Sequence, residues 1–118
     1  MKAEAVNLAG KLTLFEERWS PKVVACFNGC DVMVVKVKGR FVWHSHPETD
    51  DFFLVLRGRL TIEMRDGAVS LGPGELFVVP RGIEHCPVAE EETELLLIEP
   101  AGTPNTGDPE TAALKTKI

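Results

Sequence analysis

The sequence lacks the features that mark a nucleic-acid-binding or membrane-embedded protein. Its formal net charge is -5, so it has no excess of lysine and arginine to bind a phosphate backbone or an anionic membrane surface. No apolar run approaches the roughly 20 residues that a membrane-spanning helix needs. The first residues contain no continuous apolar segment followed by a cleavage site, which favours a cytoplasmic protein. We therefore expect neither nucleic acid nor a membrane as a partner.

Cysteine and histidine are both scarce, with three residues of each. The cysteines, at positions 26, 30 and 86, are odd in number and form no paired CxxC elements of a zinc site, so we interpret them as reduced and mostly buried thiols. Cys86 directly follows His85. On a strand its side chain would point to the opposite face, so we do not expect it to be a metal ligand.

The length and composition are those of one globular domain. The chain has 118 residues, of which 44% are hydrophobic and 26% charged. We expect a single domain over residues 1–118, with an N-terminal lead-in at 1–20, a barrel at 21–99, and a C-terminal loop and tail at 100–118.

Strand patterns follow one another through the barrel region, separated by Gly, Pro, Asn-Gly and Asp-Gly turns. The segments are KVVACF, CDVMVVKVK, RFVWHSH, DFFLVLRG, RLTIEMR, AVSL, ELFVVP, IEHCPV and TELLLIEP. Short strands at this spacing predict an all-β fold, an antiparallel sandwich or barrel. The acidic run at 90–92 is interpreted as a solvated turn.

The two ends of the chain are less regular. Apolar residues from Leu8 to Trp19 follow helical spacing, with Asn7 as a candidate N-cap, which predicts a short helix or an irregular lead-in that covers one edge of the barrel. The final segment, TAALKTKI, is expected to cross a neighbour's surface or to be mobile.

The segment DFFLVLRG is apolar on both faces, although one face of an antiparallel barrel strand is normally solvated. Either the lead-in or a partner subunit must cover the second face. We predict a homodimer.

All three histidines belong to one predicted constellation. If residues 41–46 form a strand, His44 and His46 leave the same face, and a turn then brings a carboxylate at Asp50 or Asp51 to the same place. Strand alternation favours Asp51, with Asp50 pointing outward. Imidazole and carboxylate ligands suit a divalent transition metal, namely Fe, Mn, Ni, Co, Cu or Zn. Four such ligands leave open positions for water or substrate.

The chain resembles the cupins, in particular the small conserved-barrel type called cupin 2. The first cupin motif, G…HXH…E…G, is matched by Gly39, His44, His46, Asp51 and Gly58, and the second, G…PXG…H…N, by Gly74, Pro80, Gly82 and His85. This resemblance implies a double-stranded β-helix, or jelly-roll barrel, with a metal held in its lumen by His44, His46, Asp51 and His85.

The chain also departs from the family pattern. Aspartate replaces glutamate at position 51, and Ala89 stands where the family often has asparagine. Asp51 is therefore open to three roles: direct ligand, ligand through water, or acceptor that orients a histidine.

Two functions follow from the resemblance. The first is a metal-dependent enzyme, dioxygenase-like or isomerase-like, acting on a small molecule that chelates the metal in the lumen. The second is a non-enzymatic metal-binding or small-molecule-binding sensor module. The predicted inward positions are apolar and offer no general acid or base, so no catalytic residue is assigned. These positions are Val42, Phe53, Val55, Leu60, Ile62 and Met64.

Overall fold

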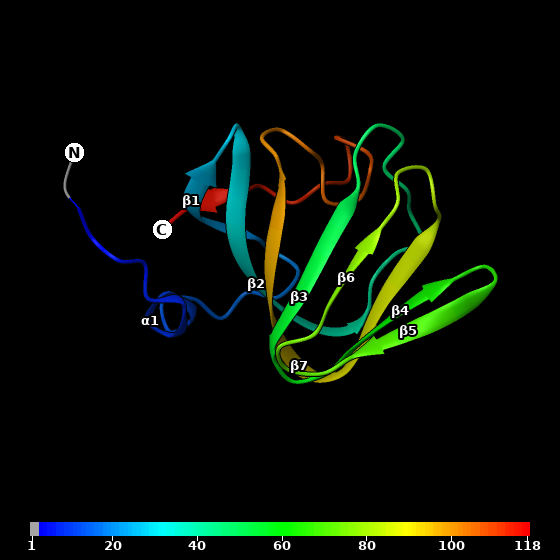
Figure 1. Cartoon of the computed structure of the whole chain (residues 1–118), viewed down its shortest axis with the longest axis horizontal. Helices are drawn as coiled ribbons and strands as arrows, with labels where there is room; N and C mark the ends of the chain where they lie inside the picture. The colour runs from blue at the N-terminus through cyan, green and yellow to red at the C-terminus, as the bar shows by residue number, and fades with distance from the viewer. Residues whose placement is uncertain (1–2) are drawn as a thin grey trace.

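In the computed structural model, residues 3–118 form one short helix and eight strands (Figure 1). The elements are α1 (Leu8–Leu12), β1 (Lys22–Phe27), β2 (Cys30–Arg40), β3 (Asp51–Arg57), β4 (Leu60–Met64), β5 (Gly67–Leu71), β6 (Leu76–Val79), β7 (His85–Pro100) and β8 (Thr116–Lys117). Within these residues no helix is long and apolar enough to cross a membrane. The prediction of an all-β fold is confirmed.

The long strand β7 holds the barrel together. It pairs antiparallel with β2 along most of its length, and also with β4 near its start and β3 near its middle. The strand order runs β5-β4-β7-β2-β1-β8, while β3 joins β7 to β6. In Figure 1 the β4–β5 hairpin lies at the opposite end of the barrel from α1.

The structure corrects the prediction of two separate strands, IEHCPV and TELLLIEP. They form the single strand β7, and the acidic run at 90–92 lies within it. The reason is the length of β2, which pairs with β7 on both sides of a register shift between Val37 and Gly39. The backbone pairing between β2 and β7 resumes after this irregularity, and the acidic side chains at 90–92 are exposed.

The prediction of a strand at residues 41–46 is wrong. Strand β2 continues to Arg40, and the following segment is irregular except for an isolated antiparallel bridge between His44 and His85. Two backbone hydrogen bonds of 3.0 and 2.9 Å make this bridge. Val42 is 51% exposed and does not point into the barrel. Backbone hydrogen bonds to β7 at His85 thus hold residues 41–46 in place, although these residues form no continuous strand.

Most of the barrel interior is apolar, and the lead-in covers part of the outer side. Interior side chains that pack together include Val37, Phe53, Val55, Leu60, Ile62, Val79 and Leu95. Asn7 Oδ1 accepts a hydrogen bond from Gly10 N and caps α1, as expected. Leu12 and Phe15 pack with Val34, Leu56 and Leu96. The lead-in therefore packs against Leu56 of DFFLVLRG, and Phe52, Leu54 and Leu56 are all half-buried.

The C-terminal tail folds back onto its own chain, which corrects the expectation that it crosses a neighbour or is mobile. Strand β8 pairs parallel with β1, and Ile118 N donates to Val23 O at 3.0 Å. Gly107 has φ +78°, and a side chain there would overlap the carbonyl oxygen of Ser45. The C-terminal loop that carries Gly107 thus lies directly against the segment that carries His44 and His46.

Candidate metal centre

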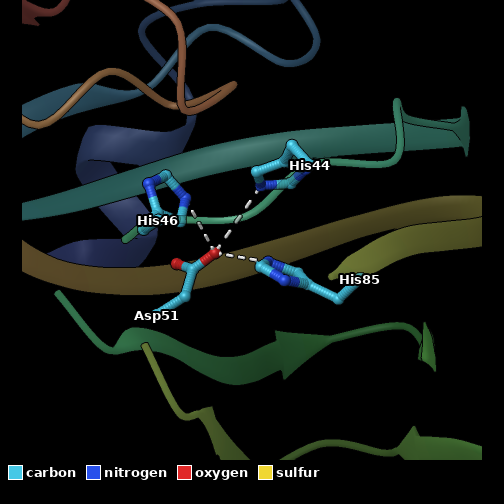
Figure 2. Close-up of side chains that lie close together, drawn as sticks. All are labelled: His44, His46, Asp51 and His85. Carbon is cyan, nitrogen blue, oxygen red and sulfur yellow. Dashed lines mark hydrogen bonds and ion pairs between the residues drawn. The ribbon is translucent and has the colours of Figure 1, made fainter. Parts of the chain in front are cut away.

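Three histidines converge on one carboxylate oxygen inside the barrel. Asp51 Oδ2 lies 2.8 Å from His85 Nε2, 3.3 Å from His46 Nε2 and 3.8 Å from His44 Nε2 (Figure 2). His44 and His46 come from the irregular segment between β2 and β3, whereas Asp51 and His85 are the first residues of β3 and β7. The candidate ligand atoms of all four residues lie within 4.8 Å of one another.

The ring orientation of two histidines is fixed by the backbone. His44 Nδ1 lies 2.9 Å from Val42 O, and His85 Nδ1 lies 2.9 Å from Ile83 O. A carbonyl oxygen only accepts, so each Nδ1 donates its hydrogen. In a neutral imidazole the lone pair then sits on Nε2, which faces the carboxylate. Two lone pairs that face each other repel, so these Nε2 atoms require a cation between them and Asp51, either a proton or a metal ion.

The Nε2 atom of His46 also requires a cation beside it. Its Nε2 atom is buried and forms no hydrogen bond within residues 3–118, although Asp51 Oδ2 lies 3.3 Å away. Burying a polar atom without a partner costs about 1–3 kcal/mol. A metal ion shared with the other two histidines would satisfy this nitrogen.

The electrostatics favour a charged Asp51. Burial raises the pKa of its carboxyl group, but the attraction of the three neighbouring histidines outweighs burial and holds the pKa far below its ordinary range. The pKa of His46 is raised: burial lowers it, and the Asp51 carboxylate outweighs that effect. The cluster therefore offers a buried carboxylate charge beside His46, whose positively charged form that carboxylate stabilises.

The structure separates the two neighbouring aspartates as predicted. Asp51 is 8% exposed and faces the histidines. Asp50 is exposed and accepts hydrogen bonds from Arg81 N and Nε at 3.0 and 3.3 Å, which lowers its pKa. Asp50 thus holds the turn before His85 in place from outside the barrel.

A small pocket opens beside the cluster, with about 40 Å³ of space for water molecules. Its walls are mostly apolar, and they include Trp19 stacked on Phe41 with ring centroids 4.6 Å apart. His44 and Asp51 form one part of the wall. Buried Cys86 is not in the cluster, whereas Cys26 is exposed, contrary to the expectation of mostly buried thiols.

One polar residue of this pocket was not predicted from the sequence. Glu99, near the end of β7, is 5% exposed and lines the pocket together with His44 and Asp51. Lys115 Nζ donates to Glu99 Oε1 at 3.0 Å. The signal in the sequence was a lone glutamate after an apolar run, which by itself does not indicate an inward side chain.

The donor set fits a transition metal. Three imidazole nitrogens and one carboxylate oxygen, all buried, are ligands of intermediate hardness. The neighbouring pocket leaves room for water or a small ligand beside the four side chains. Asp51 Oδ2 also lies within hydrogen-bond range of His85 Nε2, so this carboxylate is placed both to bind the ion and to orient a histidine.

Comparison with known proteins identifies the family. The family model described as the cupin domain matches residues 31–99, more than half of the chain, so the protein belongs to the cupins. A crystal structure of a cupin-2 domain-containing protein from Shewanella frigidimarina is 45% identical, with a TM-score of 0.79 over 80% of this chain and 93% of that one. The predicted cupin resemblance and jelly-roll barrel are both confirmed.

Two curated proteins are also similar in sequence. The uncharacterized protein YdbB of Bacillus subtilis is 32% identical over 80 residues, which cover 67% of this chain and 71% of that protein. A 3-hydroxyanthranilate 3,4-dioxygenase of Brucella anthropi is 32% identical over 85 residues, which cover 64% of this chain. That match covers 46% of the dioxygenase, so the chain spans about half its length.

Proposed function

We propose that the protein binds a divalent transition metal through His44, His46, Asp51 and His85, and that it acts on a small oxygen-containing molecule in the adjoining pocket. The observation that carries this proposal is the convergence of three buried Nε2 atoms on one carboxylate oxygen. Backbone carbonyls direct two of these nitrogens inward, and the third has no hydrogen-bond partner within residues 3–118. A bound metal ion would satisfy all three nitrogens at once.

The metal and the pocket wall around the four proposed ligands would determine which substrates bind. The metal, when bound, would supply a Lewis acid or, if it is iron, nickel or copper, a centre able to activate O₂. The Trp19 and Phe41 rings and the apolar wall would exclude water and favour a small, flat substrate. Fe, Mn, Ni, Co, Cu and Zn all suit these ligands.

Among reaction classes we favour a dioxygenase-like reaction over an isomerase-like one. The similar Brucella protein is a dioxygenase whose name states a hydroxylated aromatic substrate. The predominantly apolar pocket is compatible with such a substrate, because an aromatic ring needs few polar contacts.

A non-enzymatic sensor or binding module is the second candidate. It is favoured by the small size of the pocket and by its few titratable side chains, His44, Asp51 and Glu99. Oxygen consumption by the iron-loaded protein with small hydroxylated aromatic molecules separates the two. Turnover supports the enzyme, and ligand binding without oxygen uptake supports the sensor.

Elemental analysis tests the metal centre itself. We expect about one transition-metal ion per chain, either after purification without added metal or after loading with Fe²⁺, Zn²⁺, Mn²⁺, Co²⁺, Ni²⁺ or Cu²⁺. The variant His85→Ala should lose it. The variant Asp50→Asn is the matched control, since Asp50 faces outward, and it should keep the ion. Failure of the wild type to retain any of these ions would refute the proposed function.

We also propose that the protein is a cytoplasmic homodimer. The outer side of β3 and β6 supports the dimer: Leu76 is 54% and Val78 39% exposed, next to half-buried Phe52 and Leu54. Light scattering at micromolar concentration should give twice the mass of one chain. The mass of a single chain would contradict the dimer.

A further inference from the structure

Glu99 is a buried carboxylate that the proposed metal site does not use. It is 5% exposed and lines the same pocket as Asp51 and His44. Within the described residues, Asp51, His44 and Glu99 are the titratable side chains of the pocket wall. Since the first two belong to the proposed ligand set, Glu99 is the one left to exchange a proton with a molecule in the pocket.

The C-terminal tail supplies the partner of Glu99. Lys115 donates to Glu99 Oε1 at 3.0 Å and also to Thr103 O, and its side chain is 13% exposed. The Lys115 contact is made to Oε1, so Oε2 is the oxygen of this carboxylate that we assign to proton uptake. The charged or titratable groups that act on Glu99 are thus Lys115 from the tail, Asp51 from β3 and His46 from the preceding segment.

We propose that Glu99 accepts the proton that a hydroxyl-bearing ligand gives up when it enters the pocket as a chelating anion. This inference rests on the proposed metal-binding function. The ligand O–H bond breaks, its electron pair stays on the ligand oxygen, and a new O–H bond forms on Glu99. No oxidant or reductant takes part. The proton remains in the pocket and does not pass to bulk water.

The charges of the pocket favour a neutral ligand that becomes a chelating anion by giving its proton to Glu99. A divalent ion, the Asp51 and Glu99 carboxylates and the Lys115 ammonium would together leave one positive charge in a largely apolar space. This positive charge attracts the oxygen anion of a chelating ligand. When Glu99 keeps the ligand proton, the ligand enters as a neutral molecule, the net charge of the pocket does not change, and no proton has to cross the apolar wall. Burial raises the pKa of Glu99, and Lys115 opposes that effect, so the carboxylate is a better proton acceptor than an exposed one. The ligand class is therefore a small apolar molecule with two adjacent oxygens, one carrying the proton.

Titration calorimetry can measure how many protons are released to the buffer when a ligand binds. Acetohydroxamic acid is a suitable probe, because it is protonated at pH 7 and chelates metals as a monoanion through two adjacent oxygens. The full chain loaded with Zn²⁺ would be titrated with it in two buffers of different ionisation enthalpy. The difference between the apparent binding enthalpies gives the number of protons released to the buffer. We expect close to none from the wild type and about one per ligand from Glu99→Gln.

Two further variants make the test specific. Glu94→Gln is the matched control, because Glu94 lies on the same strand five positions before Glu99 and pairs with Lys36 away from the pocket wall; it should behave as wild type. In Lys115→Met the pKa of Glu99 should rise, so that less carboxylate is available and part of the proton is released. Equal proton release from wild type and Glu99→Gln, with equal zinc content, would overturn the proposal.

The outcomes separate this inference from the metal-binding function. If the wild type holds no zinc, the proposed function fails. If zinc is held and the probe binds, but Glu99→Gln leaves the proton count unchanged, only the role of Glu99 fails. A probe that does not bind to the zinc-loaded wild type would contradict a chelating ligand in this pocket.

Discussion

Asp51 and Glu99 are buried carboxylates that line one pocket, yet their surroundings act on them in opposite directions. Three histidines surround Asp51 and hold its pKa far below the ordinary range, despite burial. Glu99 has a single lysine, and burial dominates, so its pKa is raised. A carboxylate that stays charged suits a metal ligand, and one whose pKa rises suits a proton acceptor. The environment, more than the residue type, assigns the two roles.

The largest expected difference between the two carboxylates is in metal affinity. Asp51→Ala should weaken Zn²⁺ binding by more than about 100-fold, because a buried negative charge among the proposed ligands is lost. Glu99→Gln should weaken it by less than about tenfold, since Glu99 lies outside the ligand cluster. Competition with a chromophoric chelator measures both. A loss of about 10–100-fold in Asp51→Ala would instead indicate that Asp51 orients His85 without touching the metal.

The next effect concerns the ion pair of Glu99. Lys115→Met should lower the free energy of unfolding of the metal-free protein by about 3 kcal/mol at pH 7, because it leaves a buried carboxylate unpaired. The double variant Lys115→Met/Glu99→Gln should recover part of this loss. Urea denaturation of the wild type, the two single variants and the double variant gives the coupling free energy between Glu99 and Lys115. Additive losses would mean that the pair contributes nothing specific.

A smaller effect should appear in the pH dependence of stability. A carboxyl group whose pKa is raised by folding stabilises the native state below the pKa of the unfolded chain, about 4.3 for glutamate, and this contribution is lost as pH rises through the folded pKa. The wild type should therefore lose stability relative to Glu99→Gln between about pH 4 and neutrality, by about 1.4 kcal/mol for each unit of elevation. Thermal unfolding of the metal-free proteins across this range tests the sign, and parallel curves would contradict it.

The smallest effect is expected at Asp50, the neighbour of Asp51. Asp50→Ala removes the exposed contacts with Arg81 and should change Zn²⁺ affinity by less than about twofold. The same chelator competition applies. A large loss would show that the turn held by Asp50 sets the position of His85, and would weaken the distinction between the two adjacent aspartates.

Local sequence patterns were sufficient to predict much of the fold. Valine-rich alternation and Asn-Gly, Asp-Gly and Gly-Pro-Gly turns located most strands, because side-chain alternation and turn chemistry are properties of neighbouring residues. The same alternation placed Asp51 inside and Asp50 outside. It failed at residues 41–46, where the alternating pattern RFVWHSH resembles a strand but lacks continuous backbone partners.

The sequence by itself thus predicted the all-β barrel from local alternation and turns, and the four residues that the barrel brings together from the cupin motifs. Only the tertiary structure decided that one strand runs from His85 to Pro100, that the C-terminal loop returns to lie against Ser45, and that Glu99 meets Lys115 in the pocket. These features depend on contacts between distant segments and on which side chains the closed barrel encloses. No local periodicity encodes them, because burial is a property of the assembled chain.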